Sequence, residues 1–188
     1  MKMIMIVLLV LVSSVRGEHF GNDNIEATIF FGQNGYAYLN SIESQMYTAV
    51  SGDNLDSVVF YHVSTLDDIK YSLYDMSDSS LVWTDSLFFS FGSPVWVAIA
   101  CDVPLVAGTK YSLGVSDGAS GTIRGRYVDV TGSLLTNTGD TSPDPWSTTT
   151  ANPFNISLYG VYTNTGGEPA GESLIEGDVY IDGDVVIE

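Results

Sequence analysis

The amino-acid sequence predicts an all-β protein whose main body is an antiparallel sandwich or barrel. Between residues 20 and 163 no segment carries a convincing apolar period of 3.6 residues, which argues against amphipathic helices. Short segments rich in Val, Ile, Tyr and Phe alternate apolar and polar positions instead. Clusters of Gly, Asp, Asn and Ser separate them, as turns separate the strands of such folds.

Nine segments carry the pattern of a strand, at close to the spacing of 8–12 residues that is typical of sandwiches. They are 26–31, 45–50, 57–64, 69–75, 81–91, 95–102, 110–116, 121–129 and 154–162. Segment 95–102 reads VWVAIACD and is apolar at both alternating sets of positions, so we expect it in the middle of a sheet that is covered on both faces. Cys101 is then a small buried apolar residue, with a reactive thiol as the alternative. Segments 69–75 and 110–116 alternate with polar residues and fit strands with one solvated face.

The N-terminus, residues 1–17, has the pattern of a secretory signal peptide. Lys2 precedes an apolar run from Met3 to Val12, and small residues follow up to Gly17. The run is shorter than the roughly 20 residues that a spanning helix needs. We expect a secreted or cell-surface protein that meets the membrane only through this export signal. An uncleaved anchor, or a buried strand used in assembly, is the alternative.

The charge and the cysteine content exclude several classes of protein. A net charge of −17 with only 6 Lys and Arg leaves no basic patch for nucleic acid. The single cysteine excludes an intramolecular disulfide framework and a metal site made of cysteines alone. We therefore expect an acidic extracellular domain at residues 18–163.

The C-terminal end differs from the body. Residues 164–173 form a small, polar linker with Gly and Pro, and residues 174–188 contain a six-residue repeat, IEGDVY then IDGDVV. Such hexapeptide periodicity is typical of β-solenoids, but two repeats cannot bury their apolar column alone. The column must be covered by other chains in an oligomer or fibre, by the chain's own sandwich, or by further residues of a longer fibre protein. The expected oligomerisation residues are Ile175, Val179, Ile181, Val185 and Ile187.

Two motifs and the closing strand resemble the jelly-roll β-sandwich modules of bacterial and viral surface proteins, of the carbohydrate-binding-module type. The first motif is LYD at 73–75, and the closing strand is FNISLYGVYT at 154–163. The second motif is formed by Leu105, Ala107, Gly108, Thr109, Tyr111 and Leu113. The resemblance implies an antiparallel jelly roll with the short C-terminal β-repeat as an extension. It also implies extracellular recognition, often of glycans, or a structural role in an appendage or virion.

Glycan binding needs a flat aromatic surface and fixed polar groups. Trp146 lies beside Asp144 in a polar loop with prolines, where no alternating pattern predicts its burial. A loop tryptophan packed on the edge of the sandwich is the alternative. Trp83 and Trp96 lie in apolar strands and are expected in the core. The second candidate cluster is Arg124, Arg126 and Tyr127, for which ion pairs with Asp129 or Asp117 are the alternative.

Calcium is the one cofactor that the composition favours, because hard cations bind carboxylate and carbonyl oxygens of loops. The candidate ligands are Asp53, Asp56, Asp182 and Asp184, with turns and solvated faces as the alternative explanation. Catalytic residues are not predicted, since the acids occur mostly in strings typical of turns and His62 lies in a strand without a nucleophile elbow.

We therefore expect a non-enzymatic structural or adhesive subunit that assembles into an oligomer or an extracellular fibre. The alternative is a soluble glycan-binding module, and a glycoside-active enzyme is the third possibility.

Overall fold

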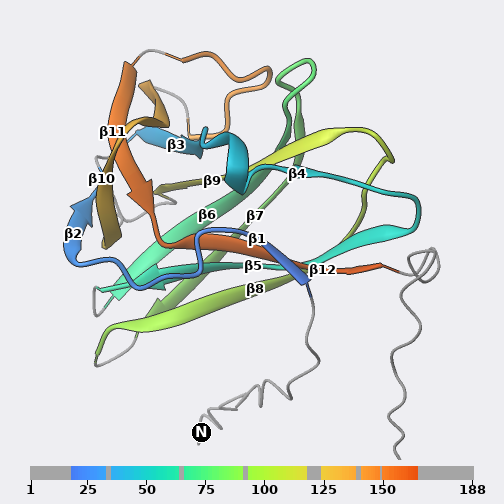
Figure 1. Ribbon diagram of the computed structural model, residues 1–188. Helices are drawn as coiled ribbons and strands as arrows, with labels where there is room; N and C mark the ends of the chain where they lie inside the picture. Colours follow the sequence, from blue (N-terminus) through green and yellow to red (C-terminus); the bar gives the residue numbers. More distant parts are fainter. Residues whose placement is uncertain are drawn as a thin grey trace, which may run out of the picture.

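The computed structural model describes residues 18–32, 35–63, 66–90, 93–117, 124–138, 141–148 and 150–164. In these residues two antiparallel β-sheets pack face to face as a sandwich (Figure 1). The helical element found there is one 3₁₀ turn, η1 (Glu43–Gln45). No helix of this part of the chain has the length and apolar character needed to cross a membrane.

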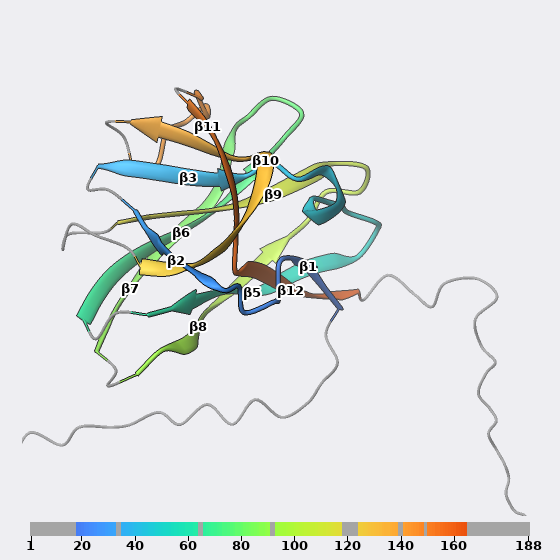
Figure 2. The same cartoon turned by 60° about the vertical axis from the view of Figure 1, so that its left-hand side comes forward.

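The smaller sheet has four strands in the order β1-β12-β5-β8. Their bounds are Glu18–Gly21 for β1, Leu158–Asn164 for β12, Asp53–His62 for β5 and Val95–Pro104 for β8. The first and last strands of the described chain, β1 and β12, lie side by side in both views (Figures 1 and 2). The chain therefore enters and leaves the sandwich through the same sheet.

The larger sheet has eight strands, six of them in the order β11-β10-β3-β9-β6-β7. Their bounds are Thr150–Ile156 for β11, Arg124–Thr138 for β10, Tyr36–Asn40 for β3, Lys110–Asp117 for β9, Leu66–Asp75 for β6 and Leu81–Ser90 for β7. The two short strands β2 (Thr28–Phe31) and β4 (Tyr47–Thr48) pair with β10 and β9. The antiparallel sandwich is as predicted, whereas the finer assignment as a jelly roll stays a prediction.

The main core lies between the two sheets and follows the alternation along each strand. Val58 and Phe60 of β5 face Tyr71 and Leu73 of β6, and all four side chains are buried. Each fully buried apolar side chain of this size contributes roughly 1.5–3 kcal/mol. Gly125 on β10 allows the sheets to approach here, because a Cβ at this position would lie 2.2 Å from Cζ of Phe60.

A second apolar cluster lies on the outer face of the larger sheet. Trp146 packs there on Leu39 of β3 and Tyr74 of β6. The loop that carries Trp146 is tied down by its backbone N–H, which donates to the carbonyl of Ser79 at 2.7 Å. Every residue from 111 to 117 is buried, and so are Ser72 and Tyr74 on the same face of β6, so the expectation that segments 69–75 and 110–116 each have one solvated face is wrong.

Strand β8 corrects another expectation. It pairs with β5 alone in the described residues and forms an edge of the smaller sheet. Val97 and Ile99 point into the core, whereas Ala98 and Ala100 are exposed. The apolar residues at the alternate positions therefore face solvent, and the prediction of a central strand covered on both faces is wrong.

Candidate ligand-binding face

The outer face of the smaller sheet carries four ring side chains, which we call the aromatic band: His19, Tyr61, Trp96 and Tyr159. The strand alternation places them there. On β8, Val97 and Ile99 point inward, so Trp96 points outward, and on β5 the buried Phe60 leaves Tyr61 on the outer side. The same alternation on β12 and β1 brings the other two rings to this face.

The rings of the aromatic band touch in sequence. The ring centroids of Tyr61 and Trp96 are 5.1 Å apart, those of Trp96 and Tyr159 also 5.1 Å, and those of Tyr159 and His19 5.8 Å. The interplanar angles of 68–73° are edge-to-face arrangements, which the aromatic quadrupole favours. Trp96 reaches from the edge strand across β5, and Val59 beneath it is only 5% exposed although it points outward. The band therefore extends over all four strands of the sheet.

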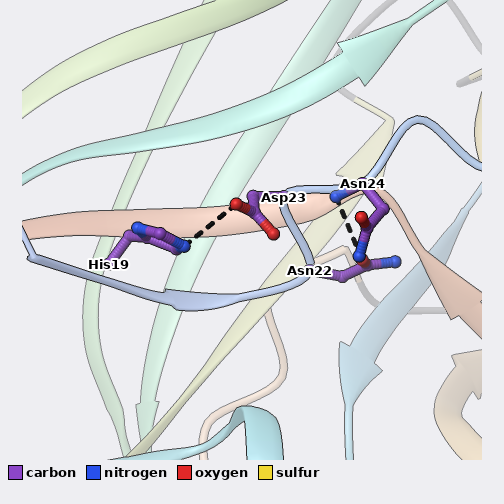
Figure 3. Close-up of polar contacts among 4 residues, drawn as sticks. All are labelled: His19, Asn22, Asp23 and Asn24. Carbon is purple, nitrogen blue, oxygen red and sulfur yellow. Dashed lines mark hydrogen bonds and ion pairs between the residues drawn. The ribbon is translucent and has the colours of Figure 1, made fainter.

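A polar turn after β1 borders the band at its His19 end (Figure 3). Nε2 of His19 lies 3.0 Å from Oδ2 of Asp23, and both side chains are about half exposed. Asn22 is 1% exposed, and its Oδ1 accepts hydrogen bonds from the backbone and side-chain nitrogens of Asn24 at 3.2 and 3.1 Å. The amide of Asn22 donates to Oε1 of Glu26 at 2.9 Å. These bonds fix the position of Asp23 beside the aromatic rings.

The turn also depends on Gly21, which has a φ of +106°. A Cβ at this residue would lie 2.5 Å from the carbonyl oxygen of Leu158, so no side chain fits. The backbone N–H of Asn22 then donates to the same carbonyl at 2.7 Å. The turn is therefore held against β12 by backbone contacts that do not involve the exposed side chains.

The electrostatics of this face are acidic. Burial, followed by the charge of Asp23, raises the pKa of the Tyr159 hydroxyl above its ordinary value. The four strands of the smaller sheet contain no Lys or Arg but four acids, Glu18, Asp53, Asp56 and Asp102, of which Asp53 is buried against Tyr47. The Nδ2 of Asn54 donates to Asp56 at 3.2 Å and to Asp102 at 2.9 Å. A ligand on this face therefore meets aromatic rings in a negative potential.

The structure does not support Trp146 as an exposed aromatic platform. Its side chain is 8% exposed, and its ring lies edge-to-face on Tyr74 at a centroid distance of 5.3 Å. Its Nε1 donates to Oγ1 of Thr148 at 2.9 Å, and Oδ1 of Asp144 accepts from the backbone N–H of Leu81. This is the geometry of the alternative explanation, a loop tryptophan packed on the sandwich.

The second predicted cluster is not assembled into one site. Arg126 donates through Nη1 to the carbonyl of Ala27 at 2.6 Å, whereas Tyr127 points to the opposite face and packs on Phe154 at a centroid distance of 4.3 Å. Arg124 is exposed at the start of β10. Neither Arg126 nor Tyr127 shares a contact with Trp146 among those described.

The predicted calcium ligands take different environments. Asp53 is buried, and its Oδ2 accepts from the hydroxyl of Tyr47 and from the backbone N–H of Val50. Oδ1 of Asp56 accepts from Asn54 and Thr163. In the described part of the chain, no three His, Cys, Asp or Glu side chains come together so that they could hold a metal ion. Asp182 and Asp184 lie outside the described residues, as do the linker from residue 165 and the repeat with its oligomerisation residues; calcium binding stays a prediction.

The aromatic band was not predicted from the sequence, because Trp96 was assigned to the core. One signal was present: Trp96, Ala98 and Ala100 occupy one set of alternate positions on β8, and Val97 and Ile99 occupy the other. Which of the two sets faces solvent depends on which face of the smaller sheet the larger sheet covers, and that packing is a tertiary property.

Comparisons with known proteins show a likeness in fold. No protein-family model and no curated protein matches the sequence. The structure is similar to that of a clostridial cysteine protease, Cwp84, after propeptide cleavage, with a TM-score of 0.55 and 12% identity over 79% of this chain. A structure of the cysteine protease and lectin-like domains of Cwp84, described as a surface layer associated protein of Clostridium difficile, matches 73% of this chain at 11% identity. Its TM-score is 0.47, too low to support an inference.

The chain spans 40% and 36% of the lengths of those two solved chains. At such low identity the likeness to the first structure shows a shared β-rich fold and nothing about a shared activity.

Proposed function

We propose that this protein is an extracellular, non-catalytic module that binds glycans through the aromatic band. The observation that carries the proposal is the row of three partly exposed rings, Tyr61, Trp96 and Tyr159, beside the fixed polar turn at Asp23. The C–H faces of a sugar pack on aromatic rings, and its hydroxyls bond to polar groups at the border.

The arrangement of the rings fits a glycan chain better than a compact ligand. Successive centroids are 5.1–5.8 Å apart, comparable with the length of one pyranose ring in a chain. The rings follow the face of a sheet, where the neighbouring strands are spaced about 4.8 Å apart. Because regular hydrogen bonding fixes these strands, the rings are positioned before a ligand arrives, which lowers the entropic cost of binding.

Two further observations support an extracellular location. Residues 1–17 have the pattern of an export signal. The fold is similar to that of Cwp84, which is described as a surface layer associated protein and which includes a lectin-like domain. Assembly into an oligomer or fibre through residues 174–188 stays a prediction.

The test compares the full chain with Trp96→Ala on a glycan array, followed by calorimetric titration of the best ligand. An aromatic contact contributes about 0.5–1.5 kcal/mol beyond the area it buries, so we expect affinity to fall by roughly two- to tenfold. Phe88→Ala is the matched control, because Phe88 is an aromatic residue on β7 that is 62% exposed and lies in the other sheet.

Tyr61→Ala provides a second variant of the band, and thermal unfolding establishes that each variant is folded. Unchanged affinity in both Trp96→Ala and Tyr61→Ala would refute the proposal. So would a loss of affinity in Phe88→Ala as large as that in Trp96→Ala.

A further inference from the structure

We propose that the aromatic band selects glycans that carry free amino groups and that Asp23 pairs with the protonated amine. This inference rests on the proposed function and names the class of glycan that the band binds. The ligand class follows from how charge is distributed between the two sheets and from what lies at the border of the band.

The lysines and arginines of the sandwich all belong to the larger sheet. Lys70 lies on β6, Lys110 on β9, and Arg124 and Arg126 on β10, and these are the Lys and Arg residues of the chain beyond Arg16. Lys110 pairs with Glu43, Lys70 donates to Thr141, and Arg126 donates to a backbone carbonyl. The strands of the smaller sheet contain no Lys or Arg, and their exposed histidine, His19, is already paired with Asp23. This face therefore repels uronic acids and attracts an ammonium group.

Asp23 is the carboxylate at the border of the band. Its side chain is 50% exposed, and one oxygen lies 3.0 Å from Nε2 of His19. The other oxygen points away from the imidazole, as Figure 3 shows. The charge of Asp23 acts on the Tyr159 hydroxyl, whose pKa it helps to raise after burial. A cation held near Tyr159 would therefore also feel this carboxylate.

The rings favour the same ligand. An ammonium group close to the face of a Trp or Tyr ring is attracted by the ring quadrupole, most strongly by Trp. Trp96 stands between Tyr61 and Tyr159 in the band, so an amine on a sugar stacked at its centre meets aromatic rings on both sides. An N-acetylated sugar of the same shape keeps the stacking but loses both the cation–π attraction and the ion pair.

The experiment uses the full chain and three oligosaccharides of one length: glucosamine, N-acetylglucosamine and galacturonate oligomers, at a pH where the amine is protonated. The cation–π attraction and one exposed ion pair together predict that the amine form binds about five- to tenfold more tightly than the N-acetylated form. The acidic oligomer should bind most weakly. Raising the salt concentration should reduce the advantage of the amine form, because screening acts on exposed charges.

Asp23→Asn should reduce the preference for the amine form to less than about threefold, because only the cation–π attraction then remains. Binding of the N-acetylated oligomer should change little. Asp129→Asn is the matched control, an exposed acid on β10 of the larger sheet, and should leave the preference intact. If Asp23→Asn disturbs the turn, binding of the N-acetylated form also falls. The salt dependence of the wild-type protein's preference for the amine form then decides whether the amine is held by an ion pair.

The two proposals fail in different ways. If no oligosaccharide binding depends on Trp96, the proposed function is refuted and the inference with it. If binding depends on Trp96 but the amine and N-acetylated forms bind equally, or the preference is insensitive to salt, the selection of amines is refuted and glycan binding by the band stands.

Discussion

Replacing Trp146 by alanine should destabilise the fold without affecting ligand binding at the aromatic band. A buried aromatic side chain removes roughly 150–250 Å² from water, and at about 25 cal/mol per Å² this gives about 4–6 kcal/mol as an upper bound. The alanine retains part of that area, so a loss of about 3–5 kcal/mol is expected, as for other Trp→Ala and Phe→Ala replacements in cores. The edge-to-face contact with Tyr74 is included in that loss.

The assay is urea unfolding followed by circular dichroism, with Trp96→Ala as the comparison. Trp96 is only half-buried on the outer face of the smaller sheet, so its replacement should cost clearly less stability. A loss below about 1 kcal/mol in Trp146→Ala would show that the cluster on the outer face of the larger sheet contributes little. Reduced glycan binding at full stability would show that Trp146 contacts the ligand, and the argument from its burial would be refuted.

Four further predictions concern Cys101, Tyr47 and Gly125. Burial, followed by nearby aspartates, raises the pKa of Cys101 from 9.0 to about 12, so a thiol reagent should modify the folded protein far more slowly than the urea-unfolded chain, as a timed alkylation can show. Because the unfolded chain releases this proton at lower pH than the folded protein does, stability should also fall as the pH rises from 9.0 towards about 12. Tyr47→Phe removes the hydroxyl that donates to Oδ2 of the buried Asp53. The other oxygen, Oδ1, accepts no hydrogen bond from any described residue, so the replacement should lower the free energy of unfolding in urea by about 1–3 kcal/mol. Gly125→Ala places a Cβ 2.2 Å from Phe60 and should cost about 1–3 kcal/mol, seen as a lower melting temperature; an unchanged value would show that the sheets can separate there.

The body of the sandwich was predictable where a strand alternates apolar and polar residues in its sequence and ends in a turn. The predicted segment 69–75 corresponds to β6, and 81–91 corresponds to β7 with its end one residue earlier. Strand β3 was missed because Tyr38 faces the main core and Leu39 faces the second cluster, so neither set of alternate positions is polar. The second half of β10, up to Thr138, was missed because its Thr, Gly, Ser and Asn residues have the composition of a turn.

One predicted strand, 154–162, is two strands in the structure. Ser157 separates β11 from β12: its N–H donates to the carbonyl of Arg126 in the larger sheet, and its own carbonyl accepts from the N–H of Tyr61 in the smaller one. A local sequence pattern contains no information about a change of partner, because both halves remain extended.

The candidate site was less predictable than the fold. The polar loop around Trp146 predicts an exposed side chain, but Trp146 is buried against Leu39 of β3 and Tyr74 of β6, which are distant in the sequence. The aromatic band joins residues from positions 19 to 159 that meet only when the smaller sheet has formed. The sequence predicts glycan binding as an alternative function, but it points to Trp146 as the aromatic surface that binds the sugar.

The order of strands in the smaller sheet also has a consequence for biosynthesis. Strand β1, near the beginning of the chain, pairs with β12 alone in the described residues, and the hydroxyl of Tyr162 donates to Glu18 across 144 positions of sequence. Strand β12 also lies between β1 and β5, so this sheet is divided until the ribosome has made residues 158–164. The complete sandwich therefore cannot form before residues 158–164 have been made. Until β12 has been made, one edge of β5 stays unpaired and open to chaperones or to another strand.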